Sequence, residues 1–238
     1  MGNLIYRTVS GSVAQLHRLD VLSNNLAHAD TVGFKADRAT FAEALDAEKR
    51  GTRFVSVPKT TIDPTPGPIE VTDNPFDLGI AGDGYFVVDA PQGQRLTRVG
   101  TFTPDGDGTL RNVHGHALLG DGGKPIQIGT SVDSGPVIVG ESGQLTQNGE
   151  PIGKLMLVKA APATLSKDGQ GLLRLEEGMA PQPDPNVSVR QGTIEESNVN
   201  PVSIMTELVT VHRHFDALQQ AIKVYRDMDE ASGRRLRS

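Results

Sequence analysis

The chain has 238 residues, enough to bury a sizeable hydrophobic core in one or two domains. Its 23 Lys and Arg against 29 Asp and Glu give a formal net charge of -6 with no long run of one sign. This argues against nucleic-acid binding, which needs a concentrated basic stripe. Because the sequence has no cysteine, disulfides, cysteine-ligated metals and thiol nucleophiles are excluded.

The N-terminal region has apolar and small residues at alternating spacings of four and three. This heptad spacing predicts an amphipathic helix with one stripe that packs against a partner. Small side chains within the stripe predict a close approach of that partner. The stripe consists of Ile5, Val9, Ser12, Leu16, Leu19, Ser23 and Leu26.

The middle of the chain alternates short β-prone runs, such as GYFVVDA and KLMLVKA, with glycine-rich turns. Turn signals include Asp105-Gly106, Asp107-Gly108 and Asn148-Gly149. These features predict a central antiparallel all-β domain at residues 77–178, without crossover helices. Proline-rich stretches on either side predict extended connecting regions at residues 36–76 and 179–199.

A second heptad stripe follows near the C-terminus, with the same spacing as the first. Asn200 is expected to cap this helix and Pro201 to occupy its first position. The predicted fold class is therefore α+β, with helices within 1–35 and 200–238 forming a coiled-coil core domain. The second stripe consists of Ile204, Leu208, Val211, Phe215, Leu218, Ile222 and Tyr225.

Side chains suited to catalysis or metal binding are sparse. His114 and His116 share a strand face, as two metal ligands might, but a metal site needs further ligands and a suitable geometry. His212 and His214 do not share a helix face, so they form a poor chelate. We therefore interpret both pairs as ordinary histidines. Asp105 and Asp107 are interpreted as hairpin residues. We expect no catalytic residue, cofactor, metal or small-molecule substrate. No apolar stretch predicts membrane insertion or a cleaved signal peptide.

The stretch LSNNLAHADTVGFKAD, residues 22–37, runs from a helical pattern into a turn-prone patch. Its polar side chains predict backbone hydrogen bonds at a sharp exit from the helix. A glycine then permits an unusual backbone conformation, and a following phenylalanine can bury its ring. The residues concerned are Asn24, Asn25, Asp30, Thr31, Gly33 and Phe34. A simple helix C-cap and a structural lock both fit this pattern.

The segment SNNLAHADTVGF resembles the ANNLAN-x-x-T-x-GF segment of the bacterial flagellar axial proteins, the rod and hook family. GDGYFVVDAPQGQRLTRVGTFTPDGDGTL is similar to the family's central G-x-G-[FY]-F … TR-x-G-x-F … G-x-L block. QGTIEESNVNPVSIM is similar to its G-x-LE-x-SNV-N motif, here with Ser197, Asn198, Val199 and Asn200. The chain departs from the family at His28, Ile194 and Asp216, where the family prefers Asn, Leu and Glu.

The resemblance implies a structural subunit that assembles with copies of itself and other rod proteins into a helical tube, part of the flagellar drive shaft. It implies export by the flagellar type III apparatus without a cleaved signal peptide, to a basal-body rod that crosses the periplasm. It also implies that the turn locks the axial core. The opening MGNLIYRTVSGSVAQL is similar to proximal-rod members, and a distal-rod subunit is the alternative. A phage-tail or adhesin-like fibre subunit and a periplasmic β-domain enzyme are the rival classes.

Overall fold

The computed structural model describes residues 2–40, 43–45, 53–55, 59–130, 134–176, 178–179 and 181–235. The chain divides into two compact units. We call residues 1–27, 37–61 and 200–238 the helical unit, and residues 28–36 and 62–199 the β unit. Each unit is therefore built from segments that are distant in the sequence.

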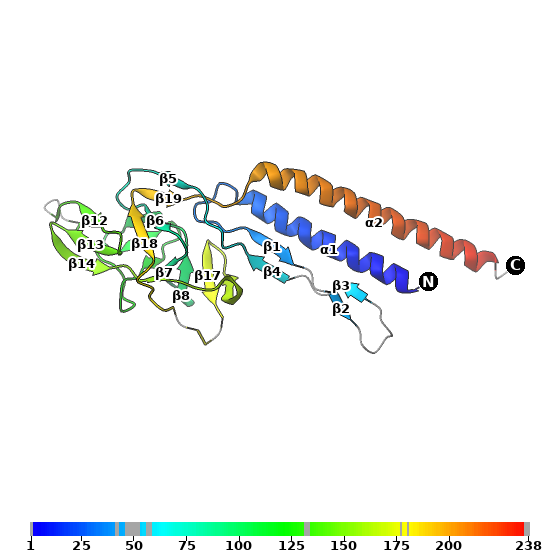
Figure 1. The fold of residues 1–238 in the computed structure, drawn as a ribbon, viewed down its shortest axis with the longest axis horizontal. Helices are drawn as coiled ribbons and strands as arrows, with labels where there is room; N and C mark the ends of the chain where they lie inside the picture. The colour runs from blue at the N-terminus through cyan, green and yellow to red at the C-terminus, as the bar shows by residue number, and fades with distance from the viewer. Residues whose placement is uncertain are drawn as a thin grey trace. The chain divides into compact units, whose positions relative to one another are not determined.

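The helical unit contains two α-helices that run side by side in opposite directions (Figure 1). The Arg18 guanidinium on the first helix binds the Glu207 carboxylate on the second, and a Cβ built at Gly11 would lie 3.8 Å from Leu218 Cδ1. The unit's elements are α1 (Gly2–Ala27), β1 (Asp37–Thr40), β2 (Glu43–Leu45), β3 (Arg53–Val55), β4 (Lys59–Ile62) and α2 (Pro201–Arg235). Strand β1 pairs with β4, whose last residue belongs to the β unit, and β2 pairs with β3.

The heptad stripe of α2 is its covered side. Every residue of this stripe is buried or half-buried, and Val211 is the most deeply buried, with 2% of its surface exposed. Along the stripe predicted for α1, Ser12 is buried whereas Val9 and Leu16 are exposed within the single chain. The packing of this stripe against a partner stays a prediction. Helix α1 contacts β1 and β3 as well as α2, so its buried residues face more than one direction. They are Ser12, Ala14, Val21, Leu22 and Asn25.

The β unit holds the remaining strands. They are β5 (Ile69–Val71), β6 (Leu78–Ala81), β7 (Tyr85–Ala90), β8 (Gly93–Thr97), β9 (Phe102–Pro104), β10 (Leu110–Asn112), β11 (Ala117–Leu118), β12 (Val137–Val139), β13 (Gln144–Gln147), β14 (Glu150–Lys154), β15 (Leu157–Val158), β16 (Leu165–Lys167), β17 (Leu172–Leu175), β18 (Ser188–Gln191) and β19 (Thr193–Glu195). A short 3-10 helix, η2 (Pro162–Thr164), precedes β16.

Strand β7 lies within the largest sheet, whose order is β16-β17-β8-β7-β11-β10-β9, with β15 also paired to β7. Phe86 and Val88 point into one hydrophobic cluster, and Tyr85 and Val87 point into another. Because successive side chains alternate across a strand, a strand buried on both faces needs the continuous apolar run YFVV. The described pairings are antiparallel, in agreement with the predicted α+β class.

The predicted turns have the backbone conformations that hairpins require. Asn148 and Gly149 have φ of 54° and 82°, and they connect β13 to β14 where Gln147 faces Glu150. Positive φ at both central residues defines the type I′ turn, which matches the twist of paired strands. Between β9 and β10, Asp105 Oδ1 accepts hydrogen bonds from the amides of Asp107 and Thr109, both at 2.9 Å. This loop is a tight hairpin, as predicted.

The two regions expected to be extended connectors contain paired strands. In residues 36–76, β1 pairs with β4 and β5 pairs with β19, and in residues 179–199, β18 pairs with β6. Pro64, Pro66 and Pro68 lie just outside the strands, where the missing N–H of proline removes no strand hydrogen bond. Much of the length of these two regions belongs to the β unit.

Candidate assembly site

The C-terminal motif begins α2 with a hydrogen-bonded cap. Asn200 Oδ1 accepts a hydrogen bond from the amide of Ser203 at 3.1 Å, and the Asn200 carbonyl accepts one from the amide of Ile204 at 3.0 Å. Pro201 is the first helical residue, where its missing N–H leaves no donor unsatisfied. The predicted cap is therefore present.

Two consecutive turns follow α1. The amide of Thr31 donates to the carbonyl of His28 at 3.2 Å, and the amide of Phe34 donates to the carbonyl of Thr31 at 3.1 Å. The hydroxyl of Thr31 also bonds His28 Nδ1 at 3.1 Å. His28, where the family prefers Asn, thus bonds within the turn through its ring nitrogen.

Gly33 occupies a position that no other residue fits. Its φ is +68°, in the left-handed region, and a Cβ built there would lie 2.4 Å from the carbonyl carbon of Arg98. The Gly33 amide donates to the Glu195 carbonyl at 2.7 Å. Backbone conformation and close packing both select glycine here.

Phe34 buries its ring, as predicted, and only 8% of its surface is exposed. The His28 ring stacks on it with 4.7 Å between centroids and 14° between planes. Lys167 Nζ lies 3.9 Å from the Phe34 centroid, an attractive distance for a cation and an aromatic ring. Phe34 therefore ties the turn to strand β16 of the largest sheet.

The asparagines and aspartate of the turn differ in their roles. Asn25 is buried, its side-chain amide donates to the Asp37 carbonyl, and its Oδ1 accepts from the Asp37 amide, both at 2.8 Å. Asn25 thus joins the end of α1 to the start of β1, twelve residues away, instead of fixing the helix exit itself. Asn24 and Asp30 are exposed, so the structure gives them no such connection among the residues it describes.

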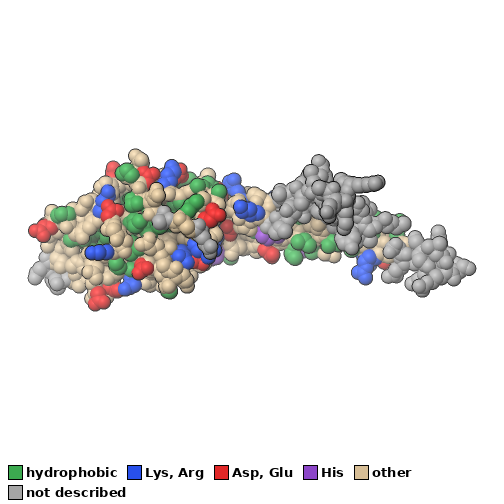
Figure 2. Space-filling view, turned by 90° about the horizontal axis from the view of Figure 1, so that it is seen from below, with side chains coloured by type: hydrophobic (Ala, Val, Ile, Leu, Met, Phe, Trp, Pro, Cys, Tyr) green, Lys and Arg blue, Asp and Glu red, His purple; other side chains and the backbone are tan. Residues whose placement is uncertain are grey.

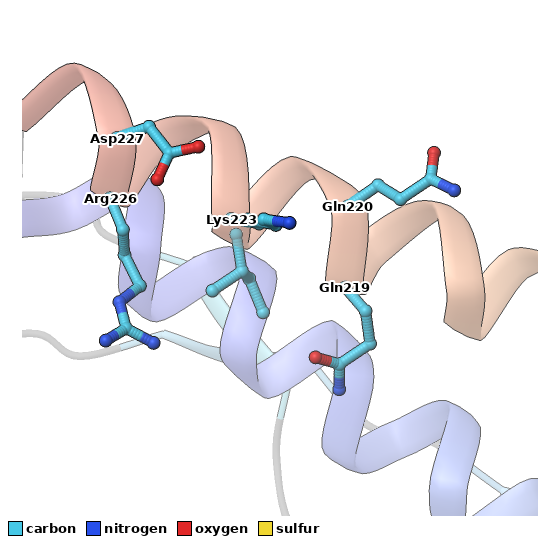
Figure 3. Close-up of a pocket in the computed structure, with 6 residues that line it drawn as sticks. Gln219, Gln220, Lys223, Arg226 and Asp227 are labelled. Carbon is cyan, nitrogen blue, oxygen red and sulfur yellow. The ribbon is translucent and has the colours of Figure 1, made fainter.

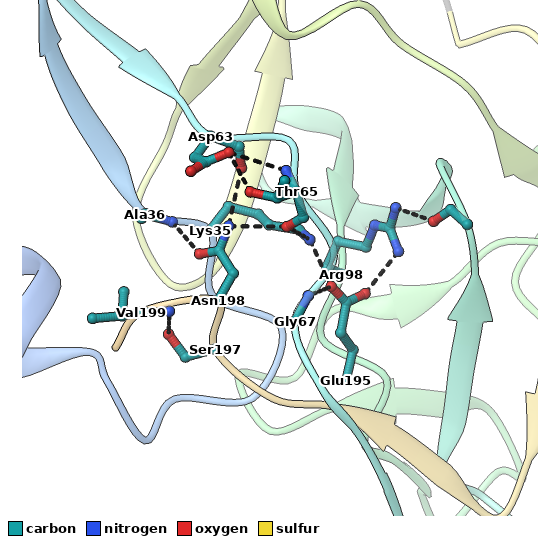
Figure 4. A network of polar contacts seen from close by, with 11 residues as sticks. Lys35, Ala36, Asp63, Thr65, Gly67, Arg98, Glu195, Ser197, Asn198 and Val199 are labelled. Atoms are coloured by element: carbon teal, nitrogen blue, oxygen red, sulfur yellow. Dashed lines mark hydrogen bonds and ion pairs between the residues drawn. The ribbon is translucent and has the colours of Figure 1, made fainter. Parts of the chain in front are cut away.

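A buried ion cluster lies beside this turn (Figure 4). Glu195 Oε1 accepts from Lys35 Nζ at 2.6 Å and from the Gly67 amide at 2.8 Å, and Oε2 accepts from Arg98 Nη1 at 2.7 Å. The Lys35, Arg98 and Glu195 side chains are each at most 2% exposed. We call these three residues the ionic triad.

The surroundings of the ionic triad shape its electrostatics. Burial lowers the pKa of Lys35 below its ordinary value, although the hydrogen bond and charge of Glu195 act in the opposite direction. Burial likewise raises the pKa of the Tyr85 hydroxyl, against the effect of Arg98. The Arg98 guanidinium lies over the Tyr85 ring, 5.2 Å from its centroid, and Nη2 donates to the Gly82 carbonyl at 2.6 Å.

Asn198 joins segments at the boundaries of the β unit. Its Oδ1 accepts from the Ala36 amide at 2.7 Å, and its Nδ2 donates to the carbonyls of Thr65 at 2.9 Å and Asp63 at 3.3 Å (Figure 4). Beside it, Ser197 Oγ accepts a bond from the amide of Val199, which is itself buried. The C-terminal motif therefore holds together the ends of the β unit.

The histidine pairs have ordinary polar partners. His116 Nε2 lies 3.1 Å from Gln170 Oε1, and His212 Nε2 lies 3.7 Å from Asp216 on an exposed face of α2. Within the part of the chain that the structure describes, no group of three or more potential metal-ligating residues is found. Among the same residues, no helix has both the length and the apolar character needed to cross a bilayer.

Both helices also carry exposed apolar residues outside their mutual contact. On α1, Val9, Val13 and Leu16 are 42%, 54% and 49% exposed. Among the described residues of α2, the large exposed apolar side chains are Val202, Met205, Val209, Val224 and Met228. Hydrophobic side chains are visible at the surface of the helical unit in Figure 2, while charges of both signs are interspersed over the β unit.

A hollow on α2 adds polar groups to this surface. Figure 3 shows Gln219 and Arg226 extending to one side of the helix and Gln220 to the other. The hollow is lined by Gln219, Gln220, Ile222, Lys223, Arg226 and Asp227.

Most of the other residues of the predicted interface are half-buried within the helical unit, and the Ile5 side chain lies outside the described residues. The half-buried residues are Leu19, Leu26, Leu208, Phe215, Leu218 and Tyr225.

Three parts of the chain match known protein families. Residues 5–35 match the family described as Flagella basal body rod protein, and residues 79–147 match Flagellar hook protein FlgE/F/G D1 domain. Residues 190–234 match Flagellar basal body rod FlgEFG protein C-terminal. The flagellar basal-body rod protein FlgF of Mesorhizobium japonicum is 36% identical over 225 residues, covering 91% of this chain and 90% of that protein. The chain belongs to the FlgF family of flagellar basal-body rod proteins.

Further relatives include both FlgF and FlgG proteins. The FlgF protein of Caulobacter vibrioides is 33% identical and covers 99% of this chain and 98% of its own length. The FlgG protein of Bacillus subtilis is 31% identical and covers 92% of this chain and 93% of its own length. The FlgG assignment is the weaker of the two.

In this FlgF-family chain, each matched region supplies one member of the ionic triad: Lys35 from the first, Arg98 from the second and Glu195 from the third. All three residues lie within or next to motifs that the sequence shows, but the sequence alone did not identify them as a site. Their signal was a charged residue beside each glycine or asparagine motif, in GFK, TRVG and IEESN. Nothing in the spacing of these segments reveals that they meet.

Proposed function

We propose that this chain is a structural subunit of the flagellar basal-body rod, and specifically of its proximal part. The rod assignment is supported by FlgF relatives that match nearly the whole chain. These relatives are named as rod proteins, and the family is structural, so the protein is not an enzyme. FlgF similarity also favours the proximal rod over the distal rod, which is the second candidate.

The observation that carries the assembly mechanism is the exposed apolar surface on both helices. Within one chain, the α2 stripe already packs towards α1, which supports the predicted coiled-coil core. Val9, Val13 and Leu16 are left uncovered on α1, and Val202, Met205 and Val209 are left uncovered on α2. Their spacings, i, i+4, i+7 and i, i+3, i+7, place each set on one helix face.

We infer that these uncovered faces meet the helices of neighbouring copies or of other rod proteins. When two different faces of the subunit bind each other, each added copy is rotated by the same angle relative to the one before. If these rotations do not close into a ring, the copies form a helical tube. The α2 stripe stabilises each subunit, while the uncovered faces join subunits. Residues of the predicted interface thus divide between the two tasks.

The location of the subunit, its export and the role of its turn belong to the same proposal. The subunit is located in the basal body, in the rod that crosses the periplasm, and is exported by the flagellar type III apparatus without a cleaved signal peptide. The lock role of the turn is part of the proposal as well. It is supported by the positive φ of Gly33 and the buried ring of Phe34.

Quantitative mass spectrometry of purified hook–basal bodies tests the assignment. The chain is expected there at low copy number beside its rod siblings, and it should be missing from the basal bodies of a strain without flagellar export. An abundance like that of the distal rod would favour the FlgG-like alternative. Absence from intact basal bodies would refute the rod assignment.

A further inference from the structure

The ionic triad carries more positive than negative charge. Two cations, Lys35 and Arg98, share the single carboxylate of Glu195, and all three side chains are at most 2% exposed. The carboxylate of Asp63 also acts on Lys35, but its effect is the smallest of those on this amine. Burying such a cluster requires removing three charges from water, so its attraction has a large desolvation cost to offset.

Two details indicate an incomplete offset of this cost. Burial is the largest influence on Lys35, and it lowers the pKa of the amine in spite of the Glu195 carboxylate. Arg98 Nε is buried and has no hydrogen-bond partner in the described part of the chain. The triad is therefore not arranged for maximal stability.

Of the two strands that pair beside the triad, β19 is buried along its length, whereas β5 has no buried face. Strand β19 pairs with β5 so that Thr193 faces Val71 and Glu195 faces Ile69. All three residues of β5 are exposed, so burial of one face of β5 cannot specify which of its residues pair with β19. Glu195 supplies specific partners instead, because its carboxylate binds Gly67 just before β5, Lys35 in the turn segment and Arg98 after β8.

We propose that the ionic triad is a register lock, which specifies how residues 33–36 and β5 pair with residues 193–198 and does so at a net cost in stability. A slip of one residue would withdraw the carboxylate from two buried cations, whereas an apolar contact would tolerate the shift. Glu195, Lys35 and Arg98 are thus positioning residues. This role goes beyond rod assembly and does not depend on it.

The test uses the full-length protein and compares Glu195→Gln with the neutral triple variant Lys35→Met, Arg98→Met and Glu195→Gln. Glutamine retains an oxygen that can accept from the Gly67 amide. Glu196→Gln is the matched control, because Glu196 is adjacent to Glu195 but exposed. The urea midpoint of each variant measures stability.

Register is read by disulfide cross-linking. The chain has no cysteine, so Val71→Cys with Thr193→Cys introduces one pair of thiols at facing positions. The amide of Thr72 bonds Gly192 and that of Glu196 bonds Pro68, so Val71 and Thr193 form a non-hydrogen-bonded pair, where side chains lie closest. The cross-linking rate then reports the native pairing.

We expect Glu195→Gln to lower the urea midpoint, the neutral triple variant to restore it to the wild-type value or above, and Glu196→Gln to leave it unchanged. In the neutral triple variant, cross-linking should nevertheless slow several-fold. A triple variant that stays as unstable as Glu195→Gln would show that the triad is a net stabiliser. Cross-linking at the wild-type rate would show that the charges specify no register. If Glu195→Gln fails to fold, the triple variant is compared directly with the wild type.

Discussion

Glu195 and Lys35 form a buried 2.6 Å ion pair although 160 residues separate them in the sequence. The same glutamate holds Arg98 and the Gly67 amide. Segments from the start, middle and end of the chain are thereby joined at one carboxylate. Close by, Asn198 bonds Ala36 and Asp63, which lie next to places where the chain passes from one unit to the other.

Replacing Asn198 with alanine should destabilise the β unit. The change removes the partner of the Ala36 amide and the Asn198 bond to the Asp63 carbonyl, whereas the Thr65 carbonyl keeps its bond from Lys35 Nζ. An unsatisfied buried group costs about 1–3 kcal/mol. Urea unfolding followed by circular dichroism measures the loss. Asn186→Ala is the control, because the Asn186 side-chain amide bonds Asp184 in an exposed turn, and the change should be nearly neutral. Equal effects of the two changes would contradict the role of Asn198.

Replacing Gly33 with alanine should be far more damaging than a similar change at Gly82. Both glycines have positive φ, so both lose about 1–2 kcal/mol from the left-handed conformation. Only at Gly33 does the new Cβ also meet backbone, 2.4 Å from the Arg98 carbonyl carbon, whereas nothing lies within 4 Å at Gly82. The difference in thermal midpoint between the two variants isolates the packing effect. A Gly33→Ala protein as stable as Gly82→Ala would remove the argument for a lock.

Replacing Asn200 with alanine should shorten or weaken the start of α2. Loss of the bond from the Ser203 amide is expected to cost about 1 kcal/mol, the usual effect of removing an N-cap side chain. Asn200→Asp should retain the cap, because a carboxylate also accepts this bond and suits a helix N-terminus. Hydrogen exchange of the Ser203 amide measures the effect. If the aspartate variant exchanges as fast as the alanine variant, the cap is not responsible.

Aspartate substitutions should separate the two helix surfaces. Val209→Asp changes an exposed residue, so the free energy of unfolding should move by no more than about 0.5 kcal/mol while rod incorporation is lost. Leu218→Asp places a charge in the stripe beside Gly11 and should reduce both helicity and incorporation. Thr210→Asp adds the same charge at an exposed polar position and is the control. Normal motility and normal rods with Val209→Asp would contradict the proposed subunit contact.

The carboxylate of Asp105, in the hairpin between β9 and β10, should make the free energy of unfolding depend on pH. The hydrogen bond from Arg111 is the largest influence that lowers the pKa of Asp105 below 3.8. A lowered pKa means that folding favours the ionised form, so this contribution is present above about pH 4 and is lost as pH falls through the folded-state value. The stability difference between wild type and Asp105→Asn should be constant near neutral pH and shrink in acid. A difference that stays constant into strong acid would exclude the ion pair as its source.

Local patterns predicted several elements because their causes are local. Asn200 and Pro201 begin α2, and Asn148 and Gly149 form a turn, since capping and turn conformations depend on neighbouring residues. The α1 stripe does not include Ala14, Val21 and Leu22, which are buried, because a helix with partners on several sides buries residues outside a single heptad stripe. Asn25 was assigned to the turn, but its partner is Asp37 on β1.

The sequence by itself determined the α+β class, the cap of α2, the tight hairpins and the glycine at position 33, because each depends on short-range backbone and side-chain preferences. Only the tertiary structure decided that Lys35, Arg98 and Glu195 meet, and which helix faces stay exposed. Such contacts join residues that are far apart along the chain, and their geometry depends on strand order and burial throughout the β unit. A charged residue in a sequence has the same appearance whether it will be solvated or buried beside its counter-ion.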